Sequence, residues 1–325
     1  MFRIMTCCLL FAFVSHSTWA DDDDENTFLN VADAGPDYLI QGEYSGMLGP
    51  DGNQKKFGFQ VIALGDHKFS ATRYLGGLPG DGWDGEVKFG ASGETIDGVT
   101  KIVADGVGYA IIARGSAQVF SANDREMGTL KRVERKSPTL GAKPPAGAVV
   151  LFDGSTAEHF ERGTIVMDKL LAANCESKET FGDHSMHLEF RTPFKPHARG
   201  QARGNSGVYL QGRYECQVLD SFGLEGKNNE CGGIYSIAEP AVNACFPPLT
   251  WQTYDIDFTA ARYEDGKKVV NARTTIKHNG ITIHDDVELP HGTPGKLPEE
   301  EGPGLLYLQG HGNPVVYRNI WFVRK

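Results

Sequence analysis

A stretch of alternating polar and apolar residues in the second half of the chain limits its folding more than any other feature. Residues 204–221, GNSGVYLQGRYECQVLDS, repeat with a period of two, which is the pattern of a β-strand with one buried face. Asn205, Tyr209 and Gln211 share one face of this strand, and Ser206, Val208 and Leu210 lie on the other. The segment therefore predicts a strand packed on a core.

The same alternation continues after a turn signal, Gly-Arg, at positions 212 and 213. Glu215 and Gln217 then face one way, and Cys216 and Val218 face the other. One sheet face thus collects a carboxylate, a phenol and several amides over two adjacent strands. That mixture is typical of a site for a polyhydroxylated ligand and unusual for a solvated surface.

The composition excludes some classes of protein. The chain has 325 residues, of which 40% are hydrophobic, so it can form a substantial core and room for two domains is available. Its net charge of −10 argues against a nucleic-acid partner, because phosphate binding needs basic patches.

The first twenty residues predict an exported bacterial protein, periplasmic or extracellular. Residues 1–20, MFRIMTCCLLFAFVSHSTWA, combine an early arginine, a short apolar run and small residues before an acidic stretch, as a secretory signal peptide does. The run is too short to span a bilayer, and no other segment reaches that length. The sequence indicates no membrane span and carries no signal for a particular oligomeric state.

Four cysteines follow the predicted signal peptide. An even number of cysteines in an exported protein favours disulfides. The four cysteines include no CxxC pair, which is the spacing that would have suggested a metal site. Of the three possible pairings we favour Cys231–Cys245, which would close a loop, with Cys175–Cys216, which would join two strands.

The rest of the chain predicts an all-β protein with two domains. Residues 21–135 contain short apolar runs separated by glycine-rich turns, which indicates a small antiparallel β-domain. Residues 136–147, KSPTLGAKPPAG, are typical of a linker. Residues 148–325 contain many regular strand signals and almost no helix, which predicts two packed sheets, a sandwich or jelly roll.

Five motifs in the second domain strongly resemble the 3-keto-disaccharide hydrolase family. They are, in chain order, VVLFDG, FGDHSMHLEFR, GNSGVYLQGRYECQVLDS, PPLTWQTYDIDF and HGNPVVYRNIWF, and the resemblance extends from about Val149 to Lys325. It implies a concanavalin-A-like jelly roll that acts on 3-keto-glucosides or 3-keto-disaccharides as a 1,2-lyase, often with hydratase activity on the resulting glucal. The first domain is not covered, so its role stays open.

The implied reaction assigns roles to particular residues. A ketone at C3 acidifies the C2 proton, so a modest base can remove it, and the group at C1 then leaves by β-elimination. We expect Glu215 or His311 to be the base, with the other assisting or binding a metal. One divalent ion acting as a Lewis acid would suit the elimination, and Glu215 and His311 are its best ligands.

The remaining candidates are expected to bind the sugar. Hydroxyl groups would be held by amides and a phenol, namely Asn205, Tyr209, Gln211, Gln217 and Gln309. Arg203 or Arg318 would stabilise a negative oxygen, and Trp251 is either a stacking platform or a core residue. His184, His187 and Glu189 also attract attention as metal ligands, but we interpret them as part of a solvated strand face.

Two alternative functions remain open from the sequence. An ordinary retaining glycosidase needs two carboxylates about 5–5.5 Å apart. Next to Glu215 on the same face lies an amide, Gln217, and Asp220 has the wrong parity, so the second acid would have to come from a loop, as Glu225 or Glu230. A non-catalytic, lectin-like module is the other alternative, since fold alone does not decide function.

Overall fold

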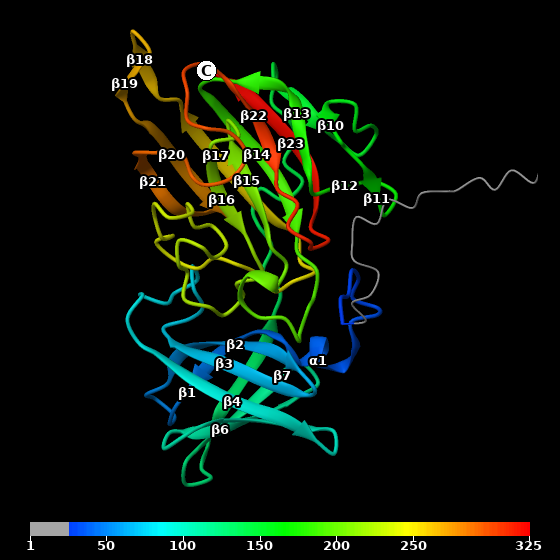
Figure 1. Cartoon of the computed structure of the whole chain (residues 1–325). Coiled ribbons are helices and arrows are strands. Elements are labelled where there is room, and N and C mark those ends of the chain that lie inside the picture. Colours follow the sequence, from blue (N-terminus) through cyan, green and yellow to red (C-terminus); the bar gives the residue numbers. More distant parts are fainter. Residues whose placement is uncertain (1–25) are drawn as a thin grey trace, which may run out of the picture.

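The structure, a computed structural model, describes residues 26–325 as two β-rich units (Figure 1). A closed barrel, drawn in blue to green, lies below a two-sheet sandwich in this view. The predicted fold class, an all-β jelly-roll sandwich preceded by an antiparallel β-domain, is confirmed. The predicted signal peptide lies outside the described residues. Within the described range, no helix is long and apolar enough to cross a membrane.

The N-terminal unit is a barrel in which each strand pairs antiparallel with the next and β8 pairs back with β1. Its strands are β1 (Gly42–Leu48), β2 (Lys55–Gly65), β3 (Lys68–Leu75), β4 (Lys88–Ile96), β5 (Val99–Ala104), β6 (Gly108–Ala113), β7 (Ser116–Ser121) and β8 (Glu126–Val133). The two-residue turn between β4 and β5 places Asp97 at φ 49° and Gly98 at φ 77°. Positive φ at both positions is what a type I′ hairpin turn requires, and such turns match the twist of the strands.

The sandwich packs against the side of the barrel at β2, where Gly223 lies against Ile62. The barrel core contains Tyr44, Phe59 and Phe69, and Phe194 and Leu249 of the sandwich pack into the same cluster. The short helix α1 (Gly35–Ile40) lies at this junction, where Tyr38 Oη donates a hydrogen bond to the Pro248 carbonyl. The shared core joins the two units by buried apolar surface and not by the chain connection alone.

Two antiparallel sheets form the sandwich. The five-stranded sheet has the order β10 (Phe160–Glu161), β13 (Cys175–Phe181), β22 (Gly304–Leu308), β15 (Ser206–Leu210) and β16 (Tyr214–Val218). The eight-stranded sheet has the order β11 (Ile165–Val166), β12 (Leu170–Ala172), β23 (Val316–Arg324), β14 (His184–Arg191), β17 (Gln252–Thr259), β20 (Ala272–His278) and β21 (Ile281–Leu289), with β9 (Val149–Phe152) paired to β23. A separate hairpin consists of β18 (Arg262–Glu264) and β19 (Lys267–Val270), and a 3₁₀ turn, η1 (Gly200–Ala202), precedes β15.

The sandwich core fixes which face of each strand points outward. Val208 and Leu210 of β15 pack in one cluster with Leu188 and Phe190 of β14. Each such side chain contributes roughly 1.5–3 kcal/mol when fully buried. A register slip of one residue would turn both β15 side chains to the outer face and lose several kcal/mol, so the core holds the alternate residues of β15 on the outside.

The four cysteines of the described residues are buried free thiols. The predicted Cys175–Cys216 pair is wrong, because β22 and β15 lie between the strands that carry the two residues. Three strand spacings separate the Cα atoms by roughly 14 Å, about twice the reach of a disulfide. Cys231 and Cys245 are hydrogen-bonded neighbours, but the predicted bond between them is not formed in this structure.

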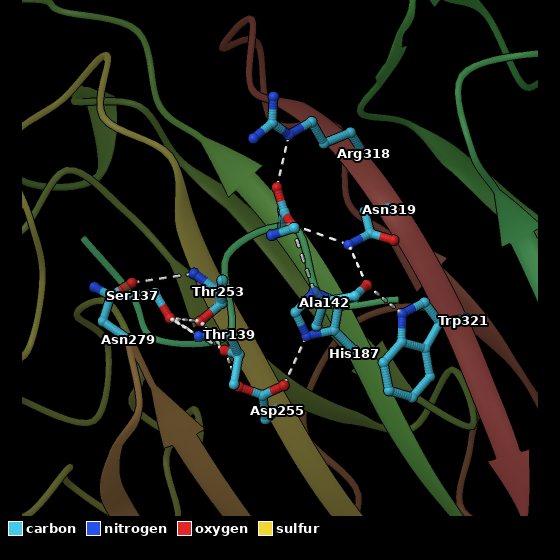
Figure 2. A network of polar contacts seen from close by, with 12 residues as sticks. Ser137, Thr139, Ala142, His187, Thr253, Asp255, Asn279, Arg318, Asn319 and Trp321 are labelled. Carbon is cyan, nitrogen blue, oxygen red and sulfur yellow. Dashed lines mark hydrogen bonds and ion pairs between the residues drawn. The ribbon is translucent and has the colours of Figure 1, made fainter. Parts of the chain in front are cut away.

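The linker at residues 136–147 is packed on the outer face of the eight-stranded sheet (Figure 2). Thr139 Oγ1 donates a hydrogen bond to Asp255 Oδ2 at 2.6 Å, and the Gly141 backbone N–H donates one to Glu189 Oε1 at 2.5 Å. The linker is therefore held in place along its first half by two strands of the sheet.

The side chains beneath the linker form a charged network that is closed to solvent. Glu189 is fully buried and accepts hydrogen bonds from Arg318 Nε at 2.6 Å and Asn319 Nδ2 at 3.0 Å. Burial alone would raise the pKa of Glu189, but these and other donors outweigh it and lower the pKa to about 2. Burial would lower the pKa of His187, yet its bonds to Asp255 and Glu189 raise it. The interpretation of His187 and Glu189 as solvated is thus wrong.

We expect Glu189→Gln to lower the free energy of unfolding by about 3 kcal/mol, because an amide has no charge to pair with Arg318 and only one oxygen to accept the hydrogen bonds that the two carboxylate oxygens accept. The stabilisation by Glu189 is complete above its unfolded pKa of 4.5 and is lost as the pH falls towards about 2. Urea unfolding should therefore show a large difference between variant and wild type at pH 6 and a much smaller one at pH 3. An equal difference at both values would contradict a charge-based role.

Candidate active site

Four polar side chains form a row across the outer face of the five-stranded sheet. Glu176 pairs with Tyr307, Tyr307 with Tyr209, and Tyr209 with Glu215, on β13, β22, β15 and β16 in turn. Directly opposed residues of neighbouring antiparallel strands project to the same face. The row is therefore a consequence of the register that the apolar core fixes on the other face.

A glycine gives the Glu215 carboxylate its place in this row. A Cβ atom at Gly207 would lie 2.4 Å from Glu215 Oε1 and 2.9 Å from Tyr209 Cε2. Any larger residue would push the carboxylate or the phenol aside. Gly207 pairs directly with Gln217, and its carbonyl accepts a hydrogen bond from the Gln309 backbone N–H at 2.8 Å. The amide residues Gln217 and Gln309 thus lie on either side of Gly207, beside the row that contains the carboxylate.

Glu215 differs from the other buried carboxylates of the described residues in having no cation beside it. Glu43, Glu189 and Asp220 each pair with an arginine. Glu215 is only 4% exposed, and among residues 26–325 its carboxylate forms no ion pair. Burial raises the pKa of Glu215 to about 7, against a weaker lowering by a hydrogen bond from Tyr209. A carboxyl group with this pKa can accept a proton near neutral pH.

The Tyr209 hydroxyl has one proton and more than one acceptor for it. It accepts a hydrogen bond from Gln309 Nε2 at 3.1 Å and donates to the Pro294 carbonyl at 3.1 Å, while the Glu215 carboxylate is also within hydrogen-bonding reach. Burial and the nearby carboxylate raise the pKa of Tyr209 well above its ordinary value. The phenol therefore stays protonated and can act as a hydrogen-bond donor at this site.

Two amide oxygens on this face are buried without a hydrogen-bond partner, Asn205 Oδ1 and Gln309 Oε1. Buried polar atoms are nearly always paired, so an unpaired acceptor indicates a place where a ligand donor fits. The Asn205 Nδ2 group is already fixed, since it donates to Gln201 Oε1 at 2.9 Å. Sugar hydroxyls are donors of the required kind.

The structure thus brings together five of the residues singled out from the sequence: Asn205, Tyr209, Glu215, Gln217 and Gln309. Gln211 does not join them. It adopts a φ of 53° in the turn after β15, where its Nε2 donates to the Phe181 carbonyl and its Oε1 accepts from Arg213. Its side chain holds the turn and is not free for a substrate.

Arg203 is turned towards the barrel and does not line this face. Its Nε pairs with Asp220 Oδ2 at 2.7 Å, and its Nη1 donates to the Ala63 carbonyl of the barrel at 3.2 Å. The side chain is buried with these acceptors around it. The expectation that Arg203 stabilises a substrate oxygen is therefore corrected to a role in joining the two units.

Arg318 and Trp251 lie on the outer face of the other sheet. The Arg318 guanidinium carbon lies 3.9 Å from the centre of the Trp251 ring, and its Nε binds Glu189 beneath the linker. The core of the sandwich separates them from Glu215. The expected substrate contacts of these two residues are thus corrected, because β23 and β22 belong to different sheets although they are neighbours in sequence.

His311 lies exposed in the loop after β22. The alternation through Tyr307 and Gln309 does not extend to it, because the strand ends at Leu308. Its backbone carbonyl accepts a hydrogen bond from Asn313 Nδ2 at 3.0 Å, while its imidazole forms no hydrogen bond or ion pair with any described residue. The structure does not place it against Glu215.

The donor set around Glu215 does not fit the expected metal. No group of three or more His, Cys, Asp or Glu side chains suited to a metal ion occurs in residues 26–325. The neighbours of Glu215 are a phenol and amides, which are weak ligands for a divalent ion. We therefore derive no chemical step through a metal.

Residues from distant segments complete this face, and the sequence pattern did not indicate them. Lys296 forms an ion pair with Glu176 at 2.5 Å, and its Nζ lies 5.3 Å from the centre of the Tyr307 ring. Thr293 Oγ1 accepts a hydrogen bond from the Glu215 backbone N–H at 2.9 Å. Only the pairing of β13 with β22 could have revealed Glu176, and a single sequence does not specify that pairing.

A family of known proteins matches the sandwich. The profile of the family described as the 3-keto-alpha-glucoside-1,2-lyase-like domain matches residues 147–323, and the chain belongs to this family. The resemblance drawn from the sequence motifs is thereby confirmed, and the chain is a carbohydrate-active enzyme.

Two solved structures from Parabacteroides distasonis, both named as candidate glycosyl hydrolases, are similar to the chain. The first is 32% identical, with a TM-score of 0.51, and the match covers 56% of this chain and 85% of the other. The second is 16% identical with a TM-score of 0.40, covering 55% and 94%. No curated protein matches the chain.

Because the pKa of Glu215 is about 7 in the folded protein and 4.5 in the unfolded chain, its burial should destabilise the fold as the pH rises through this range. We expect Glu215→Gln to be more stable than wild type at pH 8, by up to about 3 kcal/mol, and equally stable at pH 4. Thermal unfolding at both values checks this.

The control for this experiment is Glu264→Gln, which changes an exposed carboxylate on β18 that forms no ion pair with any described residue. It should leave the unfolding temperature unchanged at both pH values. A Glu215→Gln variant that is less stable than wild type at pH 8 would show that the carboxylate has a stabilising partner.

Proposed function

We propose that the sandwich cleaves 3-keto-glycosides by removing the C2 proton and eliminating the group at C1. The single observation that carries this proposal is the buried Glu215 carboxyl without a cation, whose pKa burial raises to about 7. A C2 proton acidified by a C3 ketone needs only such a modest base, whereas cleavage of an unoxidised glycoside needs a general acid together with a second carboxylate.

The neighbours of Glu215 suit the charge that develops in this reaction. As the base takes the C2 proton, the electron pair of the C–H bond moves to the C3 oxygen and forms an enolate. Tyr209, which stays protonated, would donate a hydrogen bond to that oxygen. The enolate then re-forms the ketone and expels the oxygen at C1, which breaks the C1–O bond. Tyr307, the next side chain of the row, is the candidate donor of a proton to this departing oxygen.

The unpaired amide oxygens would orient the sugar. Asn205 Oδ1 and Gln309 Oε1 can each accept a hydrogen bond from a hydroxyl group, and Gln217 lies next to Glu215 on the same face of β16. Correct placement of the C2 proton against the base contributes strongly to the rate, because the entropy cost of orienting the two groups is met when the sugar binds. Water adding to the double bond of the glucal would complete hydrolysis.

The geometry disfavours an ordinary glycosidase. The second carboxylate of the row, Glu176, is three strand spacings from Glu215, which is roughly 14 Å between backbones. Retaining and inverting enzymes need carboxyl groups about 5–9.5 Å apart. Glu176 is also neutralised by Lys296. Glu225 forms an ion pair with Lys88 of the barrel, and Glu230 accepts hydrogen bonds from the backbone at residues 226 and 227.

The direct test is incubation of the purified protein with 4-nitrophenyl 3-keto-glucoside and with its unoxidised parent, each with and without EDTA. We expect nitrophenol only from the keto form, with a rate that rises as the pH passes through about 7, because the carboxylate is the active form. Glu215→Gln should lower kcat by about 10²–10⁴-fold, and Tyr209→Phe by a smaller factor. Glu264→Gln should match wild type.

Other outcomes would assign a different function. Release from the parent sugar would indicate a glycosidase, and release from neither sugar would favour a carbohydrate-binding module. Loss of activity in EDTA would require a metal that the residues around Glu215 do not account for.

We also infer that the protein is exported from a bacterial cell, to the periplasm or the medium. Support comes from the signal-peptide pattern of residues 1–20. N-terminal sequencing of the protein recovered from these fractions should find Asp21 as the first residue. Recovery of the chain starting at Met1 from the cytoplasm would contradict export.

A further inference from the structure

The inward face of the barrel carries a partly buried arginine that no acceptor among residues 26–325 neutralises. Arg73 follows Phe69 and Ala71 on β3 with a spacing of two, and both of these side chains are buried in the barrel core. Arg73 therefore belongs to the same inward face. Its guanidinium forms no hydrogen bond or ion pair with any described residue, and its Nε is buried without a partner.

Aromatic rings, not carboxylates, surround this guanidinium. Its Cζ lies 5.1 Å from the centre of the Phe57 ring and 4.9 Å from that of Phe89, which project from the two neighbouring strands. Cation–π contacts of this kind recover only part of the hydration that a charged group loses on burial. The remaining deficit favours binding of an anion at the guanidinium.

Two neighbouring spaces in the barrel adjoin Arg73. A small pocket of about 40 Å³ is lined by apolar side chains that include Ile102 and Leu130, and a wider one of about 320 Å³ opens at the barrel mouth. Both share Arg73, Val107, Val119 and Phe120 in their walls. No acidic residue lines either space, and Arg73 and Lys55 are their charged residues.

The rim of the mouth is apolar and unusually exposed. Phe89 is 40% exposed and Val107 39%. The wider space has polar side chains only at Asn53, Lys55, Arg73 and Ser121, which is too few to replace the many hydrogen bonds of a sugar. Its volume is within the range of small-molecule sites, at about 300–1,000 Å³.

We propose that the barrel mouth binds a small apolar molecule carrying one carboxylate, either an acyl or an aryl acid. The carboxylate would bind the Arg73 guanidinium, whose planar donors match its geometry, and the apolar body would lie against Phe57, Phe89 and Val107. This site is separate from Glu215 and lies outside the residues that the family profile matches. The inference is therefore independent of the proposed lyase activity.

Calorimetric titration of the full-length protein tests this with octanoate and 3-phenylpropionate, each compared with the alcohol of the same skeleton. We expect at least one acid to bind, and the matching alcohol to bind on the order of tenfold more weakly or less, because it lacks the charge that Arg73 pairs with. Preference for octanoate would identify an acyl ligand, and preference for 3-phenylpropionate an aryl one.

Substitution of the arginine gives a second readout. Arg73→Gln should weaken binding of the acid on the order of tenfold or more, and leave binding of the alcohol unchanged. Arg114→Gln is the matched control, since it removes an exposed arginine from the β6–β7 turn that lines neither space. Unfolding temperatures of the variants report whether they fold.

Three results would overturn the proposal: no binding of either acid, equal binding of acid and alcohol, or equal binding of the acid to wild type and a folded Arg73→Gln. If Arg73→Gln does not fold, the comparison of acid with alcohol on the wild-type protein decides alone.

Discussion

The apolar contact between the two sheets of the sandwich is the interaction on which the site depends. Val208 and Leu210 of β15 pack against Leu188 and Phe190 of β14, and a shift by one residue would expose them. Because this packing fixes the register, the alternate residues of β15, β16 and β22 lie side by side on the outer face. The polar row thus lies on the opposite face of the sheet from the hydrophobic core. Core residues that contact no substrate fix the positions of its side chains.

Electrostatics then distinguishes one carboxylate from the others. Glu43, Glu189 and Asp220 are each paired with an arginine. Glu215 has a tyrosine and amides instead, so its charged form is the less stable one below about pH 7. Among the described carboxylates it is the buried one without a cation beside it, and the stability of the sandwich core offsets this unfavourable burial.

The alternation of residues 204–221 was enough to predict the strands, their inward faces and the grouping of Tyr209, Glu215 and Gln217, since period-two patterns are local. Pairings between distant strands were not accessible. Nothing in the sequence shows that β23 and β22 belong to different sheets, so Arg318 was expected beside Glu215. Closure of the barrel depends in the same way on β1 meeting β8. A buried charged network under a glycine- and proline-rich linker is equally invisible, because the composition of the linker predicts flexibility whether or not a sheet lies beneath it.

That linker has a consequence for how the two units can be separated. The family profile begins at residue 147, yet the backbone that satisfies Glu189 lies before it, at Gly141. A sandwich cut at the profile boundary would keep every strand and still lose a hydrogen-bond donor and a cover for its His187–Glu189 pair. The unit that keeps this pair covered is therefore longer than the one that the family profile recognises, and the segment between them packs as part of the sandwich although it also connects the sandwich to the barrel.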